Sequence, residues 1–476
     1  MSSKKNITRE SEVKILSENP LIFQISERQL NENNRFDVFY YHPKFLIATQ
    51  KLYSSKFPLF KLENIAVSIK DGPHNTPKFV EDGIIFLQKG DIKEGEIDFE
   101  RPKKITKEFH EKNTQTQAHP SDILIRKIGV GPREAVVVPH NAPPLHIFVT
   151  LALIRLKKDY NPYYVEIFLN SSFGRTQTER RNRGIGSPCL HLEDIKTILI
   201  PIPPKNIQDK IVRIIQKARK KKEDNLIMIR KIKDDLSNFL LDKLRLTPPK
   251  SYDGIISFTA VIEDRMDAFF YNPKFSDIMK KLKSSRFPLK KLNEIVEISE
   301  EQIDPIKFPA DSLKYVQIQD VDSKDNKIVS FTKIGGINSP SRAKMLIKTG
   351  EILVPTLGGS MESISIVPED FNNQVATNGF IILRTKNEEL RYYISEYLKS
   401  IFGQTQLERY LSGTIMPSIS KNDIENILIP NPNKKVLIDI ENKVKKTNYI
   451  IEELRNESMK IIQESKMEVE SLIIGN

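Results

Sequence analysis

Short apolar runs bounded by Gly, Pro, Asp or Asn occur in two separate stretches of the chain. In order along the chain they cover residues 83–87, 122–125, 135–138 and 149–154, and then 315–318, 351–354, 364–367 and 380–383. Runs of this length with turn residues at both ends are typical of β-strands. Each stretch is therefore expected to contain β-sheet.

A segment rich in Tyr and Leu follows each set of predicted strands, at 163–173 and 392–402. Its apolar spacing predicts a helix. A loop containing Gly and Pro comes next, and the sequence Ile-Leu-Ile-Pro then returns at 198–201 and 427–430 as one further strand. Each stretch is therefore predicted to form an α+β domain.

A longer polar segment with another apolar pattern follows each of these domains. Apolar residues recur there at alternating steps of three and four, the spacing of a heptad seam. The two series are Ile211, Ile215, Ala218, Ile229, Ile232, Leu236, Phe239 and Leu246, and Ile440, Val444, Ile451, Leu454, Ile461 and Leu472. Two such helices in one chain most simply pair in antiparallel fashion. At about 40 residues, or roughly 60 Å, they would form a coiled-coil ruler between two domains. Asn225 at a seam position either sets the register or is a tolerated polar residue.

The two stretches are copies of one sequence unit. The segment 35–45 returns at 265–275, and 173–180 returns at 402–409, so the offset is 230 residues and then 229. Between these anchors few positions keep register, among them Gln88 and Gln317, Asp91 and Asp320, and Arg155 and Arg384. A preserved frame with divergent residues suggests two modules that contact different targets, as expected of a bipartite reader.

These patterns divide the chain into six segments. They are an N-terminal arm at 1–34, a first domain at 35–204, a central helix at 205–250, a linker at 251–264, a second domain at 265–433 and a C-terminal helix at 434–476.

Composition narrows the range of functions. The chain has 74 Lys and Arg against 62 Asp and Glu, a net charge of +12, with a pI of about 9.3. This balance favours an anionic partner such as nucleic acid, although a Lys-rich proteome would give the same charge. Cys189 is the single cysteine, which excludes disulfides within the chain and thiolate metal clusters. No apolar run reaches the length of a membrane span and no signal core follows Met1, so a soluble cytoplasmic protein is expected.

The sequence offers little support for catalysis. Residues 161–164, Asn-Pro-Tyr-Tyr, resemble the Asn-Pro-Pro-Tyr motif of N6-adenine methyltransferases but lack its second Pro and any glycine-rich cofactor loop upstream. A helix N-terminus with Pro in its first turn explains the same residues. Phosphate-loop and zinc-protease motifs are also missing from the sequence. We therefore expect a protein that is not an enzyme, with no metal and no cofactor.

Loops rich in Lys, Arg, Gln, Ser and Thr fit DNA recognition better, because these side chains contact phosphates and base edges. The candidates in the first copy are His74, Thr76, Lys78, Arg126, Lys127, Arg133, Arg175, Arg181 and Arg183. Those in the second copy are Arg342, Lys344, Ser360, Gln404, Gln406 and Arg409. Because Arg181 and Arg183 are not repeated, they are the favoured base readers. The repeated pair Arg180 and Arg409 could instead hold their loops in place.

The order of these motifs resembles that of type I restriction-modification specificity (S) subunits. The motifs are the aromatic opening at 35–45, the Asp-Gly-x-His-x-Thr-Pro turn at 71–77, the Asp-Ile-Leu strand at 122–124 and the Ile-Pro-Ile-Pro-Pro exit at 200–204. The resemblance covers about 35–476. The second copy departs from it, because it lacks the 71–77 turn and has Asn-Pro-Asn at 431–433.

The resemblance implies a pseudo-two-fold molecule with two target-recognition domains joined by two antiparallel conserved helices. It implies that double-stranded DNA is read at a split, non-palindromic site and that methyltransferase and restriction (translocase) subunits are the protein partners. S-adenosylmethionine would bind the methyltransferase and not this chain. Two alternatives stay open: a free-standing methyltransferase or nuclease with duplicated domains, and a coiled-coil scaffold that contacts no nucleic acid.

Overall fold

The computed structural model describes residues 14–18, 21–25, 37–93, 95–184, 186–248, 273–413 and 415–475. The predicted linker at 251–264, most of the arm at 1–34 and residues 265–272 of the second aromatic opening lie outside these ranges. The chain divides into two compact units. Unit 1 is residues 1–224 with 456–476, and unit 2 is residues 225–455.

Part of the predicted arm has regular structure. Strands β1 (Lys14–Glu18) and β2 (Leu21–Gln24) pair in antiparallel fashion. The short apolar runs at 15–16 and 21–23 of this predicted arm therefore lie in paired strands.

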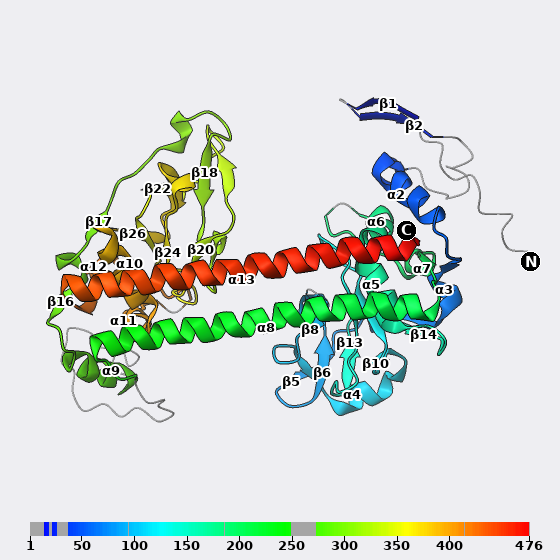
Figure 1. The fold of residues 1–476 in the computed structure, drawn as a ribbon, viewed down its shortest axis with the longest axis horizontal. Helices are drawn as coiled ribbons and strands as arrows, with labels where there is room; N and C mark the ends of the chain where they lie inside the picture. The colour runs from blue at the N-terminus through cyan, green and yellow to red at the C-terminus, as the bar shows by residue number, and fades with distance from the viewer. Residues whose placement is uncertain are drawn as a thin grey trace, which may run out of the picture. The chain divides into compact units, whose positions relative to one another are not determined.

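Unit 1 contains two main sheets (Figure 1). The antiparallel four-stranded sheet has the order β12 (Ala135–Val137), β11 (Ile123–Arg126), β14 (Leu151–Leu156) and β4 (Ala66–Asp71). The five-stranded sheet has the order β10 (Gln117–Ala118), β13 (Leu145–Ile147), β6 (Ile84–Leu87), β9 (Lys104–Ile105) and β5 (Phe79–Val80). Two short pairs complete the unit: β3 (Leu59–Lys61) with β15 (Leu199–Pro201), and β7 (Ile92–Lys93) with β8 (Glu96–Ile97).

The helices of unit 1 lie between and after these strands. They are η1 (Val38–Tyr41), α2 (Pro43–Tyr53), α3 (Leu62–Ile65), η2 (Lys89–Asp91), α4 (Lys107–Lys112), η3 (Thr114–Thr116), α5 (Pro162–Asn170), α6 (Ser172–Arg180) and α7 (Leu192–Lys196). The Asn161 side chain accepts the amides of Tyr163 and Tyr164 at the start of α5, with Pro162 in the first turn. This motif therefore caps a helix.

Unit 2 also contains two main sheets, which correspond to those of unit 1. One antiparallel sheet has the order β24 (Ser365–Ile366), β23 (Ile352–Pro355), β26 (Phe380–Arg384) and β17 (Glu297–Ser299). The other has the order β21 (Thr332–Ile334), β18 (Leu313–Val316), β25 (Gln374–Thr377) and β22 (Ala343–Ile347). The short pairs are β16 (Leu289–Lys291) with β27 (Leu428–Pro430), and β19 (Val321–Asp322) with β20 (Lys327–Ile328). In both units one central pair, β13–β6 or β25–β18, is parallel.

Most helices of unit 2 lie at positions that correspond to helices of unit 1, whereas α4 and η3 of unit 1 and η5 and η7 of unit 2 have no counterpart in the described part of the other unit. The helices of unit 2 are α9 (Pro273–Lys283), η4 (Leu292–Glu294), η5 (Pro305–Lys307), η6 (Ile318–Asp320), η7 (Glu369–Phe371), α10 (Glu388–Lys399), α11 (Ile401–Arg409) and α12 (Lys421–Glu425).

Individual hydrogen bonds are repeated as well. The side-chain amide of Gln177 donates to the carbonyl of Leu199 (2.9 Å) and accepts its backbone amide (2.9 Å), and Gln406 does the same with Leu428 (3.0 and 2.8 Å). Both glutamines are buried. Each one therefore ties the second helix of its pair to the last strand of its domain.

The single helix predicted after each sheet is in fact two helices. Ser171 ends α5, and its hydroxyl accepts the amide of Gly174 in the first turn of α6; Ser400 does the same for Gly403. A Cβ on either glycine would lie 2.3 Å from a carbonyl oxygen of the preceding helix. The tight helix–helix turn therefore requires glycine in both copies.

Two long helices, α8 (Lys205–Leu244) and α13 (Lys434–Ile474), each contribute residues to both units. In unit 1 the core includes Ile211 and Ile215 from α8 together with Val469 and Ile473 from α13. The first half of α8 therefore packs against the last turns of α13 in this unit.

In unit 2 the pairing has the same antiparallel sense. The core includes Leu240 and Leu244 from the end of α8 together with Ile440 and Val444 from the start of α13. Asn225 is buried and its amide donates to the carbonyl of Leu454 (3.1 Å) across the pair.

Nine of the 14 seam residues read from the sequence are buried, and the others are half-buried: Ile232, Phe239, Leu454, Ile461 and Leu472. Near the C-terminal end of α8, Leu240, Leu241 and Leu244 are buried as well, because the helix enters the core of unit 2 there and more than one face is covered.

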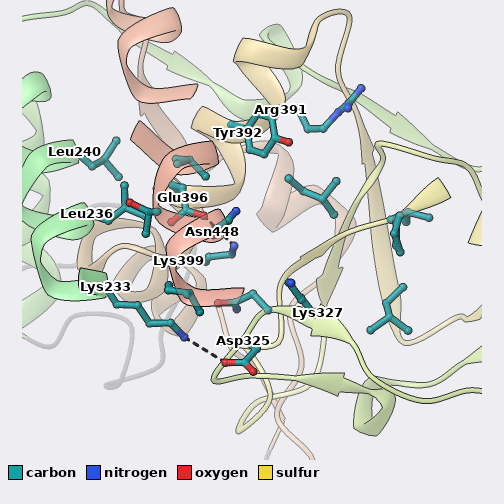
Figure 2. Close-up of a pocket in the computed structure, with 18 of the residues that line it drawn as sticks. Lys233, Leu236, Leu240, Asp325, Lys327, Arg391, Tyr392, Glu396, Lys399 and Asn448 are labelled. Atoms are coloured by element: carbon teal, nitrogen blue, oxygen red, sulfur yellow. Dashed lines mark hydrogen bonds and ion pairs between the residues drawn. The ribbon is translucent and has the colours of Figure 1, made fainter. Parts of the chain in front are cut away.

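One carboxylate of a β-hairpin in unit 2 pairs with both long helices, and Figure 2 shows its ion pair with Lys233 of α8. Asp325, in the turn between β19 and β20, pairs with Lys233 of α8 (3.4 Å) and with Arg455 of α13. Its side chain is 10 % exposed. In unit 1 the shorter turn of β7–β8 places Gly95 over Arg219 of α8.

Arg219 is held differently from the basic residues of unit 2. It pairs at 2.7 Å with Glu166 of α5, which is buried. The repeat replaces Glu166 by Ser395 and Arg219 by Asn448, which lines a cavity of about 620 Å³ in unit 2. The two units therefore fasten the long helices with different ion pairs.

The Asp325 attachment can be tested by Asp325→Asn. Two cations, each about a third exposed, would lose their shared carboxylate, and we expect unit 2 to lose about 1–2 kcal/mol of unfolding free energy. Asp304→Asn removes a more exposed ion pair and is expected to change stability by less than about 0.5 kcal/mol. Thermal unfolding and hydrogen exchange of 321–328 are the measurements. Equal effects of the two substitutions would contradict this role.

A buried histidine gives unit 1 a pH dependence. His146 of β13 is fully buried, stacks on Phe86 (6.0 Å between ring centroids) and lies 3.0 Å from the Thr116 hydroxyl through Nε2. Burial, and secondarily the charge of His110, lowers the pKa of His146 from 6.5 to about 4. The folded protein therefore keeps this ring neutral at a pH where the unfolded chain would protonate it.

The contribution of His146 to the free energy of unfolding is therefore expected to be fully present above the pKa of histidine in the unfolded chain. It should be lost as the pH falls from 6.5 toward about 4. The loss from this residue should reach about 3 kcal/mol at the acidic end. Unfolding by denaturant at several pH values measures it. His146→Gln should flatten the profile, whereas His74→Gln, at a side chain 80 % exposed, should leave it unchanged. An unchanged profile in His146→Gln would contradict the assignment.

Candidate nucleic-acid interface

Unit 2 carries an open polar hollow of about 750 Å³. It lies where β18, β23 and β25 end, beside η6 and the loop at 412–418. The side chains that could contact a ligand there are Gln317, Gln319, Arg342, Ser360, Glu362 and Asn378. Two of these, Arg342 and Ser360, were predicted from the sequence.

The amide side chains are available for binding. Gln319 and Asn378 are exposed, and neither side-chain amide has a hydrogen bond within the described part of the chain; Gln317 is half-buried at the N-cap of η6. An amide presents one donor and one acceptor side by side, the pattern that pairs with the N6 and N7 edge of adenine. The backbone amide of Asn378 donates to the carbonyl of Arg342 (2.9 Å), which fixes the spacing of these two residues.

A rigid loop forms one rim of this hollow. Ser412 and Ser418 exchange two backbone hydrogen bonds (3.0 and 2.8 Å), and Gly358 donates to the carbonyl of Pro417 (2.7 Å). Unit 1 builds the same loop, because Arg183 and Cys189 exchange two bonds (2.9 and 2.8 Å). The loops therefore share a frame and differ in the side chains at their tips.

The corresponding region of unit 1 contains ion pairs. Lys127, at the position of Thr356, is only 5 % exposed and pairs with Asp71. Arg126 is half-buried and pairs with Glu134 at 3.3 Å. Both cations are therefore occupied within the protein.

Arg133 is also inside unit 1. Its side chain is 2 % exposed, and its guanidinium donates to Asn182 Oδ1 (2.9 Å) and to the carbonyls of Gly129 (2.8 Å) and Pro188 (2.7 Å). It joins the loop at 127–133 to the loop at 181–189. This arrangement leaves Arg133 no donor directed at solvent and makes it a residue that positions both loops.

The two favoured arginines differ. Arg181 is half-buried, and its guanidinium donates to the carbonyl of Gln177 (3.0 Å) and to the Thr197 hydroxyl (3.1 Å). Burial lowers its pKa. Arg183 is exposed and makes two bonds to the carboxylate of Asp194 (2.9 and 3.0 Å), which raise its pKa.

The turn at 71–77 exposes its candidates. His74, Thr76 and Lys78 are exposed, and the His74 ring is 4.0 Å from Asp71. Arg175 on α6 is half-buried. Lys89, also exposed, lies beside Gly129 and its backbone amide donates to the Thr150 hydroxyl (3.1 Å).

The remaining candidates of unit 2 separate into two groups. Arg342 and Lys344 are exposed. Gln406 is buried in the bonds to Leu428, and Gln404 donates to two backbone carbonyls, of Met361 (3.0 Å) and Leu398 (2.9 Å). Arg409 is half-buried, and its guanidinium lies 5.9 Å from the ring of Tyr410.

Whether a residue is repeated in both copies only partly predicted whether it is structural or exposed. Repeated Arg180 is buried, donates to the carbonyl of Tyr40 (2.9 Å) and stacks on its ring, as expected for a residue that holds a loop. The sequence reasoning missed Lys89, Gln319 and Asn378. The match between Gln88 and Gln317 in the two copies could have pointed to this region, because Lys89 and Gln319 lie within two residues of these glutamines.

In the ranges that the structure describes, no group of three or more His, Cys, Asp or Glu residues could hold a metal ion. None of the described helices has an apolar stretch sufficient to cross a membrane.

Comparison with known proteins gives one sequence relative. The chain is 26 % identical over 140 residues to the specificity subunit of the type I restriction enzyme EcoBI from Escherichia coli. The match spans 29 % of this chain and 29 % of that protein. It confirms the resemblance to type I specificity subunits that the motifs indicated. No family model matches the chain.

Three solved structures show partial similarity to the chain. A chain from a study of assembly and conformational transition of the type I R-M system aligns at 14 % identity and a TM-score of 0.47, covering 88 % of this chain and 99 % of that one. The S subunit of the type I system of M. genitalium aligns at 14 % identity and a TM-score of 0.41, covering 88 % and 96 %. The HsdS subunit of Thermoanaerobacter tengcongensis has a TM-score of 0.31 at 14 % identity, covering 88 % and 97 %.

The separation of positioning and exposed arginines can be tested by Arg133→Ala and Arg183→Ala. Arg133→Ala leaves two loop carbonyls and Asn182 without their donor, and we expect unit 1 to lose about 2–4 kcal/mol. Arg183→Ala removes a side chain 48 % exposed and should cost less than about 1 kcal/mol. Chemical denaturation of the two variants measures the difference. A small loss for Arg133→Ala would contradict its positioning role.

Proposed function

We propose that this chain is the specificity subunit of a type I-like restriction-modification system. It would read a split, non-palindromic DNA site and assemble the methyltransferase subunits that modify adenine, together with restriction (translocase) subunits. The chain itself would be non-catalytic, and S-adenosylmethionine would bind the partner methyltransferase. The two α+β domains would be target-recognition domains, joined by α8 and α13 as an antiparallel pair with pseudo-two-fold symmetry.

One observation carries this proposal. The units share buried bonds, helix turns and rim loops, while exposed positions on that common frame carry different chemistry. Unit 2 presents uncharged amides at Gln319 and Asn378, whereas unit 1 presents Lys78, Lys89 and Arg183. Side chains of both kinds contact bases or phosphates in DNA. Two readers of unequal chemistry on one chain fit a site with two unequal halves.

We assign DNA contact to the exposed candidates. In unit 1 these are His74, Thr76, Lys78, Lys89 and Arg183, and in unit 2 they are Gln319, Arg342, Lys344 and Asn378, to which we add the half-buried Ser360 because it lines the hollow. Lys127, Arg133, Arg181 and Gln406 are left out because their polar groups are engaged inside the protein.

The leading alternative is a free-standing methyltransferase or nuclease. An assay of the purified chain with DNA and S-adenosylmethionine distinguishes this alternative from the proposed subunit. The proposed subunit should transfer no methyl group alone and should bind DNA with sequence preference once a methyltransferase subunit is added. Methyl transfer by the chain alone would favour the alternative. Binding that ignores DNA sequence in every state would favour a scaffold.

The first functional prediction concerns the site. Sequencing of methylated bases in a host that expresses this chain with its methyltransferase should reveal two different half-sites separated by a spacer of fixed length. A continuous or perfectly palindromic site would contradict the proposal.

The second functional prediction concerns the independence of the two readers. Exchange of 35–204 for the equivalent domain of a related specificity subunit should change one half of the methylated sequence and leave the other half intact. An exchange that changes both halves would show that the units do not read separately.

A further inference from the structure

The loop on the rim of the hollow in unit 2 ends in two exposed apolar side chains. Ile415 is 93 % exposed and Met416 is 63 % exposed. Among the large apolar residues that the structure describes, Ile415 has the highest exposed fraction. Ile415 and Met416 are adjacent in the sequence, so the loop tip carries two exposed apolar side chains together and not one scattered residue, which makes it a candidate contact surface.

The loop that carries this tip is closed at its base. The paired backbone bonds between Ser412 and Ser418, together with the bond from Gly358 to Pro417, hold its two ends together. Gly413 adopts a φ of +105°, a conformation that favours glycine.

The tip borders the polar hollow directly. Met416 is part of the lining of this hollow, together with Gln319, Asn378 and Arg342. Apolar groups at the mouth of a site whose other groups hydrogen-bond suggest a ligand with both polar edges and apolar faces. Base pairs of duplex DNA have both, because their edges carry donors and acceptors and their faces stack.

We propose that Ile415 and Met416 form an apolar wedge that enters between two base pairs of one half-site while the neighbouring amides contact base edges. This inference rests on the proposed function and adds a distortion of the DNA to it. Side chains such as Ile and Met act in this way in proteins that kink DNA. Because unstacking is easiest at flexible pyrimidine–purine steps, the wedge would add sequence preference without a hydrogen bond to the bases at that step.

The corresponding loop of unit 1 has the same frame and a different tip. Its base is closed by Arg183 and Cys189, and Gly186 and Ser187 occupy the positions of Ile415 and Met416. Residues 185 and 414 lie outside the described residues. At these two positions, large apolar side chains are therefore found in unit 2 and not in unit 1.

The test uses the chain assembled with its methyltransferase and a duplex carrying the methylated sequence. 2-Aminopurine, which brightens when it unstacks, replaces each adenine of the two half-sites in turn. The wild-type complex should brighten at one step in the half-site of unit 2. The double variant Ile415→Ser/Met416→Ser should show no brightening and should bind about tenfold more weakly or worse. Ile306→Ser, at an exposed apolar residue outside the hollow lining, is the matched control and should behave as wild type.

A second duplex separates a wedge from a surface contact. A mismatch at the brightened step removes part of the stacking that a wedge must break, so it should strengthen binding by the wild type and not by the double variant. Replacement of thymine by deoxyuridine removes only a methyl group and should leave the difference between the two proteins unchanged. If deoxyuridine abolishes that difference, the tip contacts a thymine methyl and the wedge is wrong.

Two further outcomes would overturn the wedge. Sequence-selective binding by the wild type with no brightening at any position would remove the wedge and leave the proposed function intact. Weaker association of the double variant with the methyltransferase, at unchanged DNA selectivity, would make the tip a protein contact. Failure of the wild-type complex to discriminate any sequence would reject the proposed function and the wedge together.

Discussion

Burial of apolar side chains from the long helices inside each α+β core is the interaction on which the rest of the structure depends. Ile211 and Ile440, one turn or more into α8 and α13, are fully buried in the cores of the domains that precede them. Each core also receives the far end of the other long helix, through Ile473 in unit 1 and Leu244 in unit 2. A buried side chain of this size contributes about 1.5–3 kcal/mol, so several of them make each core incomplete without both helices. The core of each domain therefore includes side chains from both long helices.

This constraint explains which residues the two copies keep. The bonds of Gln177 and Gln406, and the glycines at 174 and 403, lie where the helix pair of each domain meets the strand that leads into a long helix. Changes there would disturb the core. Loop positions carry no such requirement, and they have diverged to the point that the Lys127–Asp71 ion pair in unit 1 corresponds to Thr356 at the edge of a polar hollow in unit 2. The division of labour between frame and loops is what a protein with two different targets needs.

Periodicity and repetition predicted the frame well, because strands, seam residues and capped helix starts are set by neighbours in the sequence. The predicted strand positions agree with β6, β11, β23 and β26, among others. The two helix breaks were missed, since the apolar pattern continues across Ser171 and Ser400 and only their capping bonds stop it. The candidate site was harder to predict. Arg133, Arg181 and Arg183 are the same residue type on neighbouring loops, and only tertiary contacts decide that the first is buried, the second is held and the third is exposed.

The central claim is that exposed residues of the two units read separate halves of one DNA site. The most direct test measures the DNA affinity of the assembled methyltransferase with the wild-type chain, with Lys89→Ala and with Asn378→Ala. Each protein is measured on the intact site and on duplexes in which one or the other half-site is scrambled. The account predicts that the loss caused by Asn378→Ala, about 1–3 kcal/mol on the intact site, disappears when its own half-site is scrambled and persists when the other half is scrambled. Lys89→Ala should show the reverse dependence or, if Lys89 contacts phosphate alone, an equal loss on all duplexes with a salt slope reduced by about one. A loss from Asn378→Ala that is the same on every duplex would contradict separate reading by the two units.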